Sequence, residues 1–146
     1  MSKALLIAGG ILNAVFFVFH IILGYQIHQL TNLPAPYRAL MEALNLGGVL
    51  FLFFFSYASF FQGKELLQTG LGRAILALAA VLHLSRAAEE FFLFRFTVTV
   101  FVSCVLVGAI YVALFAIATK THASLPANAD LRSGRLRRIG GFDRAA

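Results

Sequence analysis

Long apolar runs separated by short polar segments dominate this sequence. Three of these runs contain no charged residue: Ala4–Ile27, Leu44–Phe61 and Thr97–Thr119. A helix needs about 20 mostly apolar residues to cross a hydrocarbon core of roughly 30 Å. Each of these runs therefore predicts a membrane-spanning helix.

A further apolar run, Ala74–Phe94, carries charges in its second half, within the sequence HLSRAAEEFF (83–92). Its uncharged part, Ala74–Ser85, would rise only about 18 Å as a helix, which is too short to span alone. This run can cross a membrane only if Arg86 and the neighbouring glutamates lie toward one membrane surface.

The pattern predicts an all-α membrane protein with four transmembrane helices in an antiparallel bundle. We expect spans at about 4–27, 37–62, 70–94 and 97–119, so that residues 1–119 form the transmembrane domain and residues 120–146 a basic tail. Pro34 and Pro36 favour an extended segment followed by a helix start, and Gly63 is a natural helix stop. Thr69 or Gly70 is expected to begin the third span.

The first span has an alternative interpretation as a signal peptide, because Lys3 resembles a charged n-region. An uncharged run of about 24 residues is long for the apolar part of a signal peptide, and no clear cleavage site follows it. We therefore favour a retained first helix and a multi-pass protein of a bacterial cytoplasmic membrane.

Charge is distributed unevenly along the chain. From Lys120 onward the tail carries six basic and two acidic residues, which accounts for +4 of the net charge of +6. The positive-inside rule therefore places this tail in the cytoplasm, and Lys3, Lys64 and Arg73 agree with that orientation. Both termini are expected to be cytoplasmic.

The connection between the third and fourth spans is poorly marked. The sequence EEFFLFRFTVTV (89–100) contains no Gly, Pro, Asn or Asp, the residues that usually mark a turn. The break could fall near Arg95–Thr97 or up to two turns earlier. This position decides whether Glu89 and Glu90 are buried or lie among the lipid headgroups.

Composition excludes several classes of protein. Hydrophobic residues make up 60% of the chain and charged residues 12%, which is far from the balance of a soluble domain. The single cysteine, Cys104, excludes an internal disulfide and a multi-cysteine metal site. The nucleophile-elbow, phosphate-loop, dinucleotide and CxxC motifs are absent, so the sequence favours binding over catalysis. Nothing in the basic tail favours nucleic-acid binding.

Polar residues recur on single faces of the predicted helices. Measured from the centre of each span, His20, Asn45, Arg86 and Glu90 all fall in the outer half of the membrane at 1.5 Å per residue. Buried ionisable residues in a membrane are costly and usually functional. We predict an outward polar site that binds or conducts a proton, an ion or a small amphiphile, and whose candidate residues are His20, His28, Glu42, Asn45, His83, Arg86, Glu89 and Glu90.

Other interpretations of these residues remain open. His20 and His83 could be the axial ligands of a haem b, or part of a quinone site, in a redox subunit. His28, Glu42 and Glu90 could together hold a divalent metal. In a structural accessory subunit, the same polar groups would only fix the packing of the helices.

Two surfaces are candidates for association. Ala39, Ala43 and Gly47 form a ridge of small residues, and Gly10 with Ala14 forms a second pair, which favours close packing within the chain or between copies. The tail is expected to dock on anionic lipids or on a partner in a larger membrane complex. Its docking residues would be Arg132, Arg135, Arg137 and Arg138.

Overall fold

Helices make up nearly all of the chain that the structure describes. The computed structural model describes residues 2–92 and 96–123. Its elements are α1 (Ser2–His28), α2 (Ala35–Phe61), α3 (Gly63–Gln68), α4 (Gly70–Phe92) and α5 (Val98–Ala123). Every helix except the short α3 is long and apolar enough to cross a membrane. The prediction of an all-α, multi-pass membrane protein is therefore confirmed at this level.

Local sequence explains several helix ends. Pro34 has extended backbone angles (φ −54°, ψ 138°) just before α2, and Pro36 lies in the first turn, where its missing amide hydrogen is not needed. The Thr69 hydroxyl accepts a hydrogen bond from the Gly72 amide and so caps the start of α4. The sequence does not predict α3, which fills the segment after the expected stop at Gly63.

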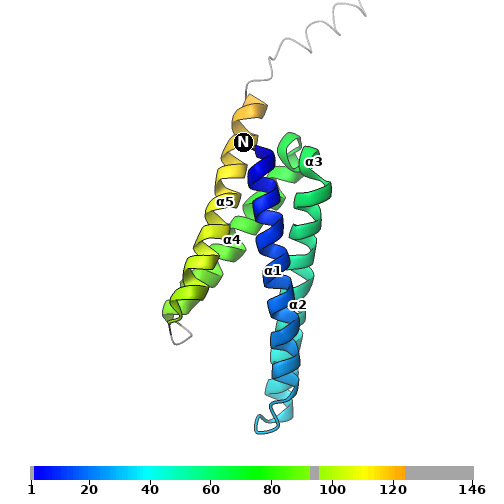
Figure 1. Ribbon diagram of the computed structural model, residues 1–146, viewed down its shortest axis with the longest axis vertical. Coiled ribbons are helices and arrows are strands. Elements are labelled where there is room, and N and C mark those ends of the chain that lie inside the picture. The colour runs from blue at the N-terminus through cyan, green and yellow to red at the C-terminus, as the bar shows by residue number, and fades with distance from the viewer. Residues whose placement is uncertain (1, 93–95, 124–146) are drawn as a thin grey trace, which may run out of the picture.

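The long helices form two hairpins, one of α1 with α2 and one of α4 with α5 (Figure 1). One end of the molecule, which we call the terminal end, carries the start of α1, the helix α3 and the end of α5. The opposite end, the loop end, carries the α1–α2 and α4–α5 connections. The hairpins lie close together at the terminal end and diverge toward the loop end.

The apolar core lies in the half of the molecule nearer the terminal end. Its most deeply buried side chains include Leu76 of α4 and Val107, Tyr111 and Leu114 of α5. The outward faces of the long helices are covered instead with large exposed apolar side chains such as Leu71 and Phe92. Such an apolar exterior is expected where the surroundings are lipid.

Glycines mark the closest approaches between elements. A Cβ on Gly10 would lie 2.9 Å from the Phe60 ring, so the predicted small-residue position on α1 does lie in a seam with α2. The ridge on α2 behaves differently: Ala39 and Ala43 are exposed, and a Cβ on Gly47 would meet nothing within 4 Å. This ridge therefore is not a packing seam within the chain.

Candidate functional site

Four polar side chains, one from each long helix, are hydrogen-bonded in series inside the protein. His83 Nε2 of α4 lies 3.0 Å from Asn13 Oδ1 of α1, and Asn13 Nδ2 donates to the Tyr111 hydroxyl of α5 at 2.7 Å. The Tyr111 hydroxyl in turn lies 2.9 Å from the Ser59 hydroxyl of α2. All four side chains are buried, and His83, the most exposed, is at 7%. We call them the core network.

The donors and acceptors of the core network can be assigned from chemistry. Asn13 Nδ2 also donates to the Gly9 carbonyl at 2.8 Å, and a carbonyl only accepts, so the orientation of the amide is fixed. Asn13 Oδ1 must then accept, which makes His83 Nε2 a donor. The Tyr111 oxygen accepts from Asn13, and in the hydrogen bond between Tyr111 and Ser59 either hydroxyl can donate.

This assignment gives the network a structural role. A side-chain amide does not pass protons along a chain as imidazoles and hydroxyls do, so Asn13 interrupts any proton path through the network. Hydrogen bonds between helices do stabilise packing in lipid, where polar groups have few other partners. The core network therefore fixes the register of the two hairpins against each other.

The core network also lies where the contact between the hairpins ends. Toward the loop end, Asn13 is the last buried residue of α1 before Ile27, close to the helix end. On α2, residues 35–51 contain no buried residue, and Leu52 is the first. Beyond the network, therefore, the halves of the hairpins near the loop end do not cover each other.

His20 and Asn45 join α1 to α2 near the loop end. Asn45 Nδ2 donates to the His20 carbonyl at 3.0 Å, so Asn45 Oδ1 accepts from His20 Nδ1 at 2.9 Å. A Cβ on Gly24 would lie 2.7 Å from Asn45 Nδ2, and one on Gly48 would lie 3.2 Å from the His20 ring. Each polar side chain therefore packs over a glycine of the opposite helix.

Arg86 and Glu90 hold the connection between α4 and α5. Glu90 is 2% exposed, and its Oε1 lies 2.7 Å from Arg86 Nη2. Its Oε2 accepts from the Thr97 amide at 3.0 Å, just before α5 begins. A carboxylate at a helix N-terminus is favourable for hydrogen bonding and for the helix dipole. Glu89, in contrast, has a side chain that is 44% exposed and lies 3.7 Å from Arg86.

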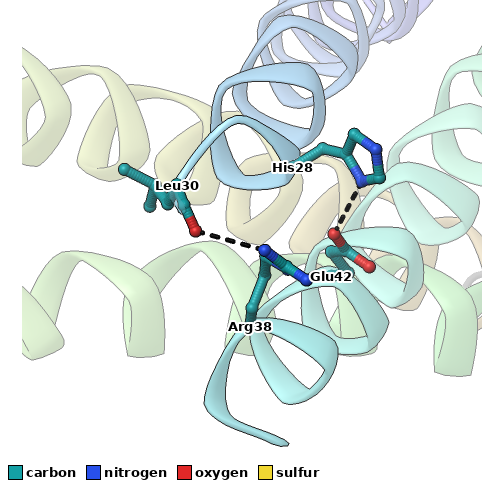
Figure 2. Close-up of polar contacts among 4 residues, drawn as sticks. All are labelled: His28, Leu30, Arg38 and Glu42. Atoms are coloured by element: carbon teal, nitrogen blue, oxygen red, sulfur yellow. Dashed lines mark hydrogen bonds and ion pairs between the residues drawn. The ribbon is translucent and has the colours of Figure 1, made fainter. Parts of the chain in front are cut away.

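His28 and Glu42 form an exposed pair beside the α1–α2 connection (Figure 2). His28 Nδ1 lies 3.0 Å from Glu42 Oε1, and the His28 side chain is 72% exposed. Arg38 reaches across the same connection and donates to the Leu30 carbonyl at 3.4 Å. These contacts connect the first helix of the hairpin to the second.

The residues predicted to share one outward site are thus arranged in separate groups. His20 with Asn45 and His28 with Glu42 belong to the first hairpin, Arg86 with Glu89 and Glu90 belongs to the second, and His83 lies in the core network. Within residues 2–92 and 96–123, no group of three or more potential metal ligands is present. The trio of His28, Glu42 and Glu90 is therefore divided between the hairpins.

The haem interpretation is not favoured by this arrangement. Two axial ligands must face one iron from opposite sides. His20 Nδ1 is bonded to Asn45 within the first hairpin, whereas His83 Nε2 is bonded to Asn13 between the hairpins. Ligation through His83 Nε2 would break the core network.

Of the core network, only His83 is among the predicted site residues; Asn13, Tyr111 and Ser59 are not. The sequence gives only a weak signal for the two hydroxyls, because Tyr111 lies on a strongly apolar helix and Ser59 is one of several polar residues of α2, with Ser56 and Tyr57. The predicted docking residues Arg132, Arg135, Arg137 and Arg138 lie outside the described residues.

No protein-family model, curated protein or solved structure matches this chain.

Proposed function

We propose that this protein is a membrane-embedded binding module that holds a small amphiphile between its two hairpins, on the loop-end side of the core network. The observation that carries the proposal is the end of the contact between the hairpins at Asn13 and His83. Nearer to the loop end, the Arg86 side chain of the second hairpin is 37% exposed. Apolar side chains bordered by a few polar groups suit an amphiphile.

Aromatic and aliphatic side chains supply the apolar part of this site. Phe16 follows Asn13 by one turn of α1, and its ring centroid lies 5.9 Å from that of His83. The chain of the amphiphile would lie toward the lipid, and its head near His83 and Arg86. Entry from the side, out of the surrounding lipid, needs no opening of the core.

The proposal includes an antiparallel four-helix arrangement with both termini in the cytoplasm, in a bacterial cytoplasmic membrane. The described residues at the terminal end include more bases than acids: Lys3, Lys64, Arg73 and Lys120 against Glu65. Those toward the loop end include more acids: Glu42, Glu89 and Glu90 against Arg38 and Arg86. The positive-inside rule supports this orientation, and anionic lipids would then meet the basic terminal end.

Self-association is a further part of the proposal. In the ridge of Ala39, Ala43 and Gly47, both alanines are exposed and a Cβ on Gly47 would meet nothing within 4 Å. Small residues let helix backbones approach closely in lipid. The ridge is therefore the surface on which a second copy, or another subunit, would pack.

A single tryptophan tests the binding proposal directly, because the chain contains none. In Phe16→Trp protein in phosphatidylcholine nanodiscs, we expect bromoundecanol to quench fluorescence with a saturable dependence on concentration. The physical reason is that a probe bound in a site holds its bromine beside the indole ring. It therefore quenches the tryptophan at concentrations too low for probe dissolved in the bilayer to do so. The measurement is a fluorescence titration.

Val15→Trp is the matched control, since Val15 is the neighbouring residue and is 61% exposed. Its quenching should rise in proportion to the quencher in the bilayer, without saturation. Equal, unsaturable quenching at both positions would contradict the proposal and leave the space between the hairpins to ordinary lipid.

A further inference from the structure

His83 keeps one polar atom that the protein does not use. Its Nε2 donates to Asn13, which is fixed by the Gly9 carbonyl. The ring lies parallel to Tyr111, with an interplanar angle of 2° and centroids 6.2 Å apart, and Phe16 lies against it from α1. Among the described residues, none donates a hydrogen bond to Nδ1.

The other nitrogen of the ring is an acceptor. A neutral imidazole carries one N–H, and the core network requires that proton on Nε2. The neighbours that touch the ring are neutral: Asn13, Phe16 and Tyr111. A charged imidazole would be costly among them, so Nδ1 carries a lone pair. The side chain is only 7% exposed, but Nδ1 is not one of the fully buried side-chain atoms that lack a partner, so this nitrogen is partly accessible from outside the core. A donor that reaches it would form a favourable hydrogen bond.

We propose that His83 Nδ1 accepts a hydrogen bond from the head of the bound amphiphile, and hence that the ligand has a neutral or cationic head with a hydrogen-bond donor, such as an alcohol, a phenol or a protonated amine. This inference rests on the binding function proposed above, and it adds the chemistry of the head. It assigns His83 a role both in the core network, through Nε2, and in the ligand site, through Nδ1.

The charges near the site favour the same class of ligand. Arg86 is paired with Glu90 at 2.7 Å and lies 3.7 Å from Glu89, so this group carries one more negative than positive charge. An anionic head would be repelled by the excess carboxylate, whereas a neutral or cationic head would not. Arg86 is therefore not free to act as an anion receptor.

The test compares heads on one alkyl chain, using the Phe16→Trp protein in phosphatidylcholine nanodiscs. The probes are bromoundecanol, its methyl ether, bromoundecylamine, the trimethylammonium analogue and bromoundecanoate. We expect the alcohol and the amine to bind about tenfold more tightly than the ether, the trimethylammonium compound and the carboxylate, because only the first two donate to Nδ1.

Two further results are expected. In a second protein that also carries His83→Phe, an aromatic ring is kept but no acceptor remains. The alcohol should then bind no better than the ether in that protein. In the protein with His83 intact, the imidazole ¹⁵N NMR spectrum should give a protonated Nε2 and an unprotonated Nδ1.

The outcomes separate the two proposals. Saturable binding with equal affinity for alcohol and ether overturns the role of Nδ1, which water would then satisfy, but keeps the binding function. An NMR spectrum that shows a protonated Nδ1 also overturns this role, and that measurement does not require the His83 variant to fold. If no probe quenches saturably, the binding function itself fails.

Discussion

Replacing Asn13 by alanine is expected to lower the free energy of unfolding by about 3 kcal/mol. Asn13 is fully buried and makes hydrogen bonds to Gly9, Tyr111 and His83. Its removal leaves the His83 Nε2–H without an acceptor in an apolar interior and takes from the Tyr111 hydroxyl one of its two partners, so that only Ser59 remains. The measurement is reversible unfolding in mixed micelles.

Asn45→Ala is the matched control. Asn45 also makes two hydrogen bonds to α1, but it is only half-buried and lies within one hairpin. Its loss should cost about 1 kcal/mol, in the range of interhelical hydrogen bonds in membranes. In a double-mutant cycle, Asn13→Ala and Tyr111→Phe should be clearly non-additive. Equal costs for the two asparagines, with additive behaviour, would contradict the role given to the core network.

Replacing Glu90 by alanine is expected to destabilise the protein by about 3 kcal/mol. The change leaves Arg86 without its closest partner and the Thr97 amide without its acceptor. Both effects weaken the connection between α4 and α5, which has no turn-forming residue of its own. Unfolding in mixed micelles measures the loss, and Glu90→Gln should cost less because its amide oxygen can still accept.

The neighbouring Glu89 supplies the control for this prediction. Its side chain is 44% exposed and lies 3.7 Å from Arg86, so Glu89→Ala should change stability by less than about 0.5 kcal/mol. A similar cost at both positions would mean that the carboxylates act through their summed charge and not through the contacts of Glu90.

The helices of this protein could be predicted from the sequence because lipid imposes a simple rule on length and polarity. Uncharged runs of sufficient length had to be spans, and Thr69 before Gly70 correctly indicated the start of α4. The end of α4 was harder to predict. The Glu90 carboxylate holds it by accepting a hydrogen bond from the Thr97 amide, seven residues further on. The residues that usually mark the end of a helix in a sequence, Gly, Pro, Asn and Asp, are absent there.

The candidate site was only partly predictable. His20, Asn45 and Arg86 were expected to meet because they lie at similar depths in the membrane. Depth does not determine which residues belong to the same hairpin: His20 pairs with Asn45 in the first hairpin, and Arg86 pairs with Glu90 in the second. The hairpins diverge, so groups at similar depth remain on different hairpins. His83, one of the predicted site residues, is bonded to Asn13, which was not among them.

The role of the small-residue ridge also depended on information that the sequence lacks. A helix pattern gives the face on which Ala39, Ala43 and Gly47 lie, but not which neighbour covers it. In the structure the helices of the first hairpin pack through other glycines, Gly24 and Gly48, beneath Asn45 and His20. The ridge therefore takes no part in the packing of this hairpin.

The central claim is that a defined amphiphile binds beside Phe16, where the contact between the hairpins ends. The most direct measurement replaces Phe16 by a photoreactive benzoylphenylalanine in native membranes and identifies the crosslinked molecule by mass spectrometry, with Val15 as the control position. We expect one predominant adduct at position 16, with a hydroxyl or amino head, and a mixture of bulk phospholipids at position 15. The same phospholipid mixture at both positions would contradict it.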